Sequence, residues 1–263
     1  MAQRLTHRPR ILVARSLHPQ YRETVRTLTR NLGLAVEEIG FGDCGGVSSA
    51  ELRSKMGPDV CGLIVQSPNY FGVVEDLAGL SGIVREQKGL MIVAVAEAVS
   101  LGLLEAPGRL GADIVCGEAQ SFGIPPSFGG PGLGFMGCKK EYLRQLPGRI
   151  CGMTKDVDGR RGFVLTLSTR EQHIRREKAT SNICSNQGWC ALRAAIYLET
   201  VGPDGLREIA RQNLLKSAYA AAVLGKIPGV KLRFRGKTFN EFVLELPKEA
   251  APVAKAVQAA GIL

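Results

Sequence analysis

The sequence lacks any long apolar run and any segment that looks like an export signal. None of its hydrophobic stretches approaches the roughly 18 residues that a membrane-spanning helix requires. The N-terminus, MAQRLTHRPR, is basic but has no apolar core of the kind found in signal peptides. We therefore expect a cytoplasmic protein that does not associate with a membrane.

Cysteine and histidine are present without the spacing that would give them a chemical role. The cysteines are odd in number and no pair has CxxC spacing, so disulfide and zinc sites are disfavoured and reduced thiols are expected. Three histidines (His7, His18 and His173) show no pattern that pairs them with a cysteine, which argues against a thiol nucleophile. The seven cysteines are Cys44, Cys61, Cys116, Cys138, Cys151, Cys184 and Cys190.

Nucleotide-binding motifs are also missing, although the chain is basic. Neither GxxxxGK[ST] nor GxGxxG occurs. The net charge of +10 leaves three explanations open, namely a nucleic acid, an acidic protein partner that a basic surface would steer, or no specific partner. Lys and Arg are spread along the chain and only 6% of residues are aromatic, so a nucleic acid is disfavoured.

The chain instead shows a regular alternation of strand-like and helix-like segments. Its 263 residues, 45% of them hydrophobic and 22% charged, are enough for one large α/β domain or for a large and a small one. Such alternation is typical of a parallel sheet with helices on its faces. The predicted strands are 10–14, 34–39, 60–66, 90–95, 112–116 and 134–138, and the predicted helices are 18–32, 49–56, 73–87, 99–104 and 140–145.

The C-terminal third predicts helices followed by a small α+β unit. A helix that begins near Ile183 should end at Gly202-Pro203, where a second helix starts and continues to Leu224. Two strand-like runs (230–233 and 241–246) and a helix near 250–260 follow. We expect a large α/β domain at 1–202 and the start of a small C-terminal domain at 203–263.

The segment Gly162–Trp189 predicts a strand, a polar turn and a helix in direct succession. Phe163 to Leu167 alternate as in a strand, after an Asp-Gly hairpin turn at 156–159. Ser181 or Asn182 could accept hydrogen bonds from the first N–H groups of the helix, in which Trp189, Leu192 and Ile196 follow at helical spacing. Many α/β proteins hold anions at such a turn. A solvated loop before an ordinary helix is the alternative.

The loop Gln120–Gly134 is rich in glycine and proline. Glycine lets the backbone approach a ligand or another chain closely, and proline stiffens the loop. The loop could be a rigid interface or a wall of an active site.

The run REQHIRREKATSNICSNQ closely resembles the α-type half (subunit 1) of glycine decarboxylase, the P-protein of the glycine cleavage system. The resemblance extends through Gly111–Gly134 and Pro147–Val164, and more loosely over almost the whole chain. It implies a three-layer αβα fold, namely the large domain of a type I pyridoxal-phosphate-dependent transferase (aspartate-aminotransferase-like), plus part of a small α+β C-terminal domain.

The resemblance also implies that the cofactor site of this chain is degenerate. The catalytic β-type half of that family carries the Schiff-base lysine in a His-Lys-Thr-Phe run before a glycine-rich segment. The matching run here is Ala119-Gln120-Ser121-Phe122, so Gln120 stands at the lysine position, and an amide cannot form that bond. Glu97 stands where such folds place an Asp against the pyridine nitrogen.

Further site residues follow from the resemblance. Lys139 and Lys140 are candidates for a displaced Schiff base, which would make the chain a free-standing pyridoxal-phosphate enzyme; surface lysines before a helix are the simpler interpretation. Residues expected at a subunit interface or in an active-site wall are Gly129, Gly130, Lys178, Thr180, Ser181 and Asn182.

By the same resemblance, the chain is expected to be a subunit that does not carry the cofactor. Its partner, a β-type P-protein subunit in an α2β2-like assembly, would hold pyridoxal phosphate. The complex would decarboxylate glycine and transfer the aminomethyl group to the lipoyl H-protein. Because segments typical of the family are absent at both ends, a truncated chain is expected, inactive in isolation, and a non-functional structural fragment is a further alternative.

Overall fold

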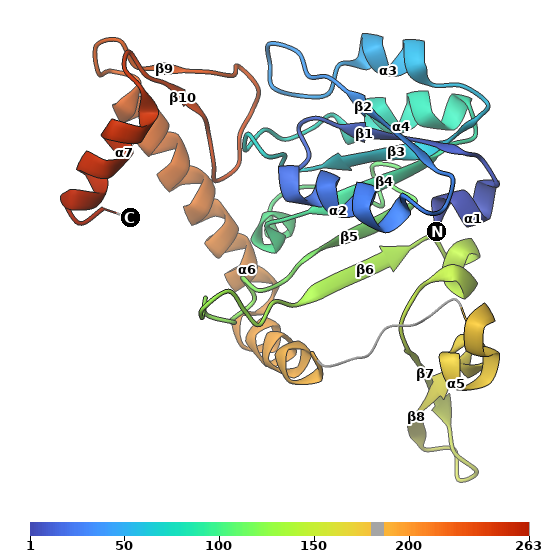
Figure 1. Cartoon of the computed structure of the whole chain (residues 1–263). Coiled ribbons are helices and arrows are strands. Elements are labelled where there is room, and N and C mark those ends of the chain that lie inside the picture. Colours follow the sequence, from blue (N-terminus) through green and yellow to red (C-terminus); the bar gives the residue numbers. More distant parts are fainter. Residues whose placement is uncertain (180–186, 263) are drawn as a thin grey trace.

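The computed structural model describes residues 1–179 and 187–262, and its main body is a six-stranded sheet (Figure 1). The strand order is β2-β1-β3-β4-β5-β6; β1 to β5 are parallel, and β6 runs antiparallel to β5. All six overlap the predicted strands. The reversal of β6 follows from a connection that contains no helix to carry the chain back across the sheet. The strands are β1 (Arg10–Ala14), β2 (Ala35–Ile39), β3 (Val60–Gln66), β4 (Leu90–Val95), β5 (Ile114–Glu118) and β6 (Gly134–Cys138).

Helices lie on both faces of this sheet (Figure 1). On one face, α3 (Ser49–Lys55) and α4 (Leu77–Glu86) cover the main core, in which strand residues such as Leu12 and Leu63 are completely buried. On the other face lie α1 (Ala2–Thr6) and α2 (Pro19–Thr29). The three-layer αβα arrangement that the sequence predicted is confirmed.

A two-stranded hairpin, β7 (Ile150–Lys155) and β8 (Arg161–Thr166), stands apart from the main sheet (Figure 1). The predicted Asp-Gly turn joins its strands, with Gly159 at φ 80°. The predicted strand at 163–167 is therefore real, but it does not lead directly into a helix of the sheet. Short helical turns follow β8, and Ser181 and Asn182 lie outside the described residues, so the anion site considered at that turn stays a prediction. These turns are η3 (Ser168–Arg170), α5 (Gln172–Arg175) and η4 (Arg176–Lys178).

The long helix α6 (Gly188–Leu224) crosses from the β5–β6 side of the sheet to the C-terminal segment (Figure 1). Gly202 interrupts it with φ 63° and ψ −179°, because Pro203 has no N–H to donate and disfavours a helical residue before it. The predicted break is thus present as a kink within one continuous element. The division into domains at 1–202 and 203–263 stays a prediction.

The C-terminal segment is smaller than the sequence predicted. Only β9 (Lys231–Leu232) and β10 (Leu244–Glu245) pair, antiparallel, before α7 (Ala250–Ala259). Two further 3₁₀ helices complete the fold, namely η1 (Ala98–Gly102) and η2 (Lys140–Gln145). Among the helices that the structure describes, not one combines the length and the hydropathy needed to cross a bilayer.

Candidate functional site

The carboxyl ends of the parallel strands meet at one edge of the sheet, where ligands bind in open α/β folds. Val95 of β4 pairs with Gly117 of β5, so Glu97, just beyond β4, and Gln120, just beyond β5, leave neighbouring strands at this same edge. Both side chains are half-buried. The two residues predicted at a cofactor position therefore lie at the same edge of the sheet, on neighbouring strands, and their cofactor role stays a prediction.

Glu97 is already engaged by its own loop. One carboxylate oxygen accepts a hydrogen bond from the Val99 N–H at 2.9 Å and caps η1, and the Ser100 hydroxyl donates to the Glu97 carbonyl at 2.7 Å. The side chain is thus anchored at a helix start, where a carboxylate interacts favourably with the helix dipole.

Glu118 fixes both ends of the loop that carries Gln120. Its Oε1 accepts hydrogen bonds from the Gln120 N–H at 2.9 Å and from the Leu133 N–H at 2.6 Å, and the Ala119 N–H donates to the Leu133 carbonyl at 2.7 Å. Glu118 was not among the site residues predicted from the sequence. A charged side chain directly at the end of an apolar strand was the signal that could have revealed it.

Phe122 connects the same loop to α6. Its ring stacks on Tyr197 with centroids 6.4 Å apart, and it packs against the cluster that contains Ala210 of α6 and the buried Phe239. Gly123 has φ 79°, and a Cβ there would lie 2.9 Å from the Tyr197 ring, so only glycine fits. Ser121, by contrast, is exposed. Of the predicted Gln120–Ser121–Phe122 run, Phe122 is therefore committed to packing.

Gly129 and Gly130 lie at the open tip of the loop. Gly129 is exposed and has φ 88°, with no atom within 4 Å of the position of a Cβ. The neighbouring Phe128 is fully exposed, and the Gly130 N–H donates to the Ser127 carbonyl at 2.9 Å. This tip is exposed, and its role at a subunit interface or in an active-site wall stays a prediction.

Lys139 and Lys140 lie at the opposite edge of the sheet. Because β6 is antiparallel, its last residue, Cys138, pairs with Ile114 at the beginning of β5. The Lys139 Nζ is 2.5 Å from Oδ1 of the buried Asp113, whose Oδ2 accepts the Met91 N–H at 2.8 Å. Lys139 thus neutralises a buried carboxylate, and neither lysine is brought near Gln120 or Glu97.

The residues predicted from the REQHIRREKATSN run do not join this edge in the described part of the chain. Lys178 ends η4, which follows α5 beside the hairpin (Figure 1). Arg170, from the turn before α5, donates to the carbonyls of Leu146 and Gly148, just beyond η2. Thr180, Ser181 and Asn182 lie outside the described residues. Their proposed interface role stays a prediction.

A buried polar network connects the loops at the carboxyl edge. It was not predicted from the sequence. Glu75 is 6% exposed and accepts hydrogen bonds from the Ser16 hydroxyl (3.0 Å), the Asn69 amide (2.7 Å) and the Val47 N–H (2.9 Å). Burial raises the pKa of the Glu75 carboxyl, and these hydrogen bonds oppose that rise. One side chain thus joins the loops that follow β1, β2 and β3.

The C-terminal segment docks on these same loops. Val73 and Thr238 form an antiparallel bridge, and the Phe239 N–H donates to the Gly72 carbonyl at 3.1 Å. The Phe239 side chain is 1% exposed. The Glu75 network therefore also shapes the surface that receives residues near 238.

His18 begins α2 at the end of the β1 exit. Its Nδ1 accepts the Gln20 N–H at 3.2 Å, so Nε2 carries the proton when the ring is neutral. The ring lies 5.0 Å from both Tyr21 and Tyr70, which are partly exposed. These three rings form an aromatic cluster at the carboxyl edge, beside the N-terminus of α2.

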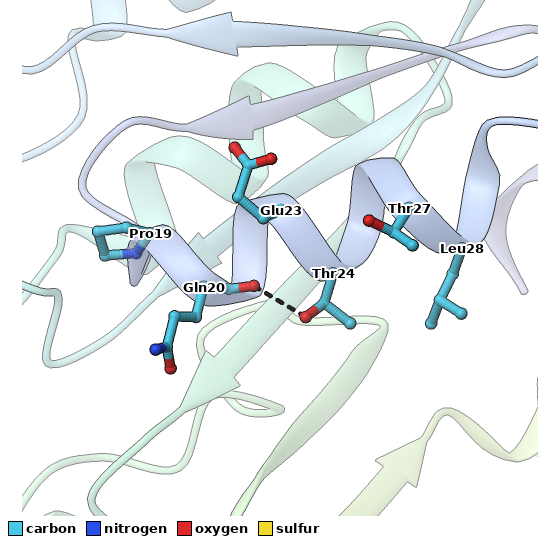
Figure 2. Close-up of a pocket in the computed structure, with 6 residues that line it drawn as sticks. All are labelled: Pro19, Gln20, Glu23, Thr24, Thr27 and Leu28. Carbon is cyan, nitrogen blue, oxygen red and sulfur yellow. Dashed lines mark hydrogen bonds between the residues drawn. The ribbon is translucent and has the colours of Figure 1, made fainter.

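A shallow groove lies along α2 (Figure 2). Figure 2 shows that every lining residue belongs to this one helix and that the Thr24 hydroxyl donates to the Gln20 carbonyl within it, at 2.8 Å. A groove formed by one helix alone has no converging groups to fix a ligand. Its lining residues are Pro19, Gln20, Glu23, Thr24, Thr27 and Leu28.

Comparisons with known proteins agree with this geometry. A family described as "Glycine cleavage system P-protein" matches residues 1–262. A protein of Desulforamulus reducens named "Probable glycine dehydrogenase (decarboxylating) subunit 1" is 50% identical over 257 residues, which are 96% of this chain and 56% of that protein. The chain thus spans little more than half the length of the curated relatives it matches.

Two solved structures show the same arrangement of elements. A crystal structure of inhibitor-bound glycine decarboxylase (P-protein) of the glycine cleavage system is 39% identical, with a TM-score of 0.93 over 99% of this chain and 58% of that chain. A sphingosine-1-phosphate lyase of Burkholderia pseudomallei has a TM-score of 0.70 at 18% identity, over 99% of this chain and 56% of that one. The second likeness concerns the fold alone.

Proposed function

Because the chain belongs to the glycine cleavage system P-protein family, we propose that it works as subunit 1 of a glycine dehydrogenase (decarboxylating). In this proposal the partner, a β-type P-protein subunit, carries pyridoxal phosphate. The complex decarboxylates glycine and transfers the aminomethyl group to the lipoyl H-protein. The names of the curated relatives support the subunit assignment.

The observation that carries this proposal is the absence of an amine along the ligand-binding edge. The exits of β1, β3, β4 and β5 contain no lysine, and all of them are described residues; they are 15–18, 67–76, 96–104 and 119–133. Pyridoxal phosphate in this fold is held by a lysine amine, and Gln120 offers only an amide. The residues of this edge therefore do not fit a covalently held cofactor, which supports placing it on the partner.

The alternative of a free-standing pyridoxal-phosphate enzyme requires Lys139 or Lys140. Lys139 is already engaged in an ion pair with Asp113. Both lysines lie at the amino edge of the parallel strands, away from Glu97. This geometry disfavours the alternative.

Within the proposed complex, the degenerate edge serves as scaffold and wall. Glu97 caps η1, the Gln120 N–H is held by Glu118, Phe122 packs on Tyr197 of α6, and Ser121 is exposed. We propose that the loop tip at Gly129 and Gly130 lines the subunit interface or the entry of the lipoyl arm. The same interface role is proposed for Lys178, Thr180, Ser181 and Asn182, and the domain division at 202/203 is retained as part of the proposal.

We also propose a cytoplasmic location. The six cysteines in the described residues are all free, and disulfides are rare in the reducing cytoplasm. Their thiols contribute to packing: Cys61, for example, is completely buried, and burial raises its pKa to about 11, which keeps it unreactive.

Co-purification with a β-type P-protein subunit tests the proposed function. We expect a stable complex, with glycine-dependent release of carbon dioxide only when both chains and a lipoyl H-protein are present. Absence of any association would contradict the subunit assignment, and carbon dioxide release by this chain alone would contradict the degenerate site.

A further inference from the structure

The β7–β8 hairpin exposes one apolar face. In its ladder Cys151 pairs with Leu165 and Met153 pairs with Phe163, and residues directly opposite each other share a face of the hairpin. Met153 is 72% exposed, Phe163 65% and Leu165 61%. We call these four side chains the hairpin face. In the described part of the chain they lie open to solvent, and an isolated two-stranded hairpin is marginally stable in water, so a covering surface is expected.

Two basic residues lie at one end of the hairpin face, and we call them its basic rim. The next pair of the ladder, Lys155 and Arg161, lies on the same side, and the Arg161 guanidinium is 5.9 Å from the centroid of the Phe163 ring. Residues 139–178 contain eleven Lys and Arg against five Asp and Glu, so this segment holds most of the net charge of +10. Some of these cations are paired, such as Lys139 with Asp113, but Arg161 faces an aromatic ring and no carboxylate within the described ion pairs.

We propose that the hairpin face is the docking surface for a different protein chain whose own surface is apolar at its centre and acidic at its rim. Apolar contact with a ring of opposite charge is the usual composition of a specific interface. A second copy of this chain is a poor occupant, because it would bring another cationic rim against the first. Of the three explanations that the sequence left open for the net charge, this proposal selects the acidic protein partner.

The choice of partner rests on the proposed function. In the proposed function, subunit 1 needs a β-type partner that carries pyridoxal phosphate. We expect the surface of that partner to have a patch with an apolar centre and an acidic rim, which fits the hairpin face. The surface itself is argued from exposure and charge alone. A binding experiment can therefore show that the hairpin face is not the docking surface while the proposed function still holds.

Two pairs of matched variants test the surface in the full-length chain. Phe163→Glu places a charge on the hairpin face, and Val164→Glu places the same charge on the adjacent residue, which is 48% exposed and points to the other side. Arg161→Glu reverses a rim charge, and Arg109→Glu makes the same change at a remote site that is exposed. Binding to the purified β-type subunit is measured by titration calorimetry at two salt concentrations.

We expect Phe163→Glu to weaken binding at least about ten-fold, the size of effect that a buried aromatic anchor gives, while Val164→Glu leaves binding nearly unchanged. Arg161→Glu should weaken binding and reduce its salt dependence relative to Arg109→Glu. Equal binding by Phe163→Glu and the wild type would overturn the surface and leave the proposed function standing. No binding by the wild type would overturn both. A wild-type dimer that Phe163→Glu dissociates, seen by light scattering, would assign the face to a second copy instead.

Discussion

The main sheet and the β7–β8 hairpin have similar sequence patterns and opposite environments. Leu63 of β3 is completely buried between the sheet and its covering helices, whereas Leu165 of β8 is 61% exposed. Both lie in strand-like apolar runs. The comparison shows that an apolar strand pattern predicts a strand but does not identify the surface that will cover it, which can belong to the same chain or to another one.

The largest expected effect separates these two leucines directly. Leu63→Ala should lower the free energy of unfolding by about 2–5 kcal/mol, because it leaves a cavity in a packed core. Leu165→Ala should change it by less than about 0.5 kcal/mol, as exposed substitutions usually do. Urea unfolding of the isolated chain measures both. Equal losses for the two variants would mean that the hairpin face is covered within this chain.

The second prediction concerns the buried hydrogen-bond network around Glu75. Glu75→Ala leaves the donors of Ser16, Asn69 and Val47 without their acceptor, and we expect a loss of about 1–3 kcal/mol. The C-terminal segment near residue 238 should also pack less tightly on the loop after β3. Faster hydrogen exchange at the Phe239 N–H, which donates to the Gly72 carbonyl, would report this change.

The pH dependence of the Glu75 contribution has a defined sign. Burial raises the pKa of this carboxyl in the folded state, so the native protein binds the proton more tightly than the unfolded chain. Stability relative to Glu75→Gln should therefore be greatest in acid and should fall as the pH rises above the ordinary carboxyl pKa of about 4.3 and through the raised value. A relative stability that increases over this range would contradict the assignment.

Lys139 lies where the sheet leads into the hairpin segment, and it should give a smaller effect. Lys139→Met removes the partner of the buried Asp113 carboxylate. Because the Lys139 side chain is 38% exposed, solvent screens the pair, and we expect a loss of about 1 kcal/mol. Lys140→Met, at the exposed neighbour, is the matched control and should be near neutral. If Lys139→Met abolished a cofactor absorbance band, the free-standing alternative would return.

The smallest effect is expected at the hairpin turn. The Asp156 Oδ1 accepts the N–H groups of Asp158 and Arg160, each at 2.9 Å. Asp156→Ala should speed local hydrogen exchange in β7 and β8 several-fold while changing global unfolding by less than about 0.5 kcal/mol, because the hairpin lies apart from the main core. A global loss comparable to that of Leu63→Ala would show that the two regions unfold as one unit.

Much of the fold could be predicted because its signals are local. The strands β1, β3 and β4 are short apolar runs bounded by polar turns, and Pro203 after Gly202 predicted the kink in α6. The antiparallel direction of β6 and the separation of the hairpin depend on which strands pair over long distances. No short-range pattern encodes that choice.

The candidate site was predictable only in part, for a similar reason. The resemblance placed Gln120 and Glu97, and strand adjacency brought them to one edge. Glu118 and Glu75 were missed, because each also bonds to groups distant in sequence, such as the N–H of Leu133 and the N–H of Val47. Lys139 was a candidate in sequence and is an ion-pair partner in the structure, since only the antiparallel course of β6 takes it to the far edge.

The central claim is that this chain supports a cofactor held by another subunit. The most direct test treats the purified two-subunit complex with borohydride, which fixes a pyridoxyl group to the lysine that bears it, and then maps the label by peptide mass spectrometry. The account predicts labelled peptides from the β-type subunit and unlabelled lysines throughout this chain. A pyridoxyl group on Lys139, Lys140 or any other lysine of this chain would contradict it.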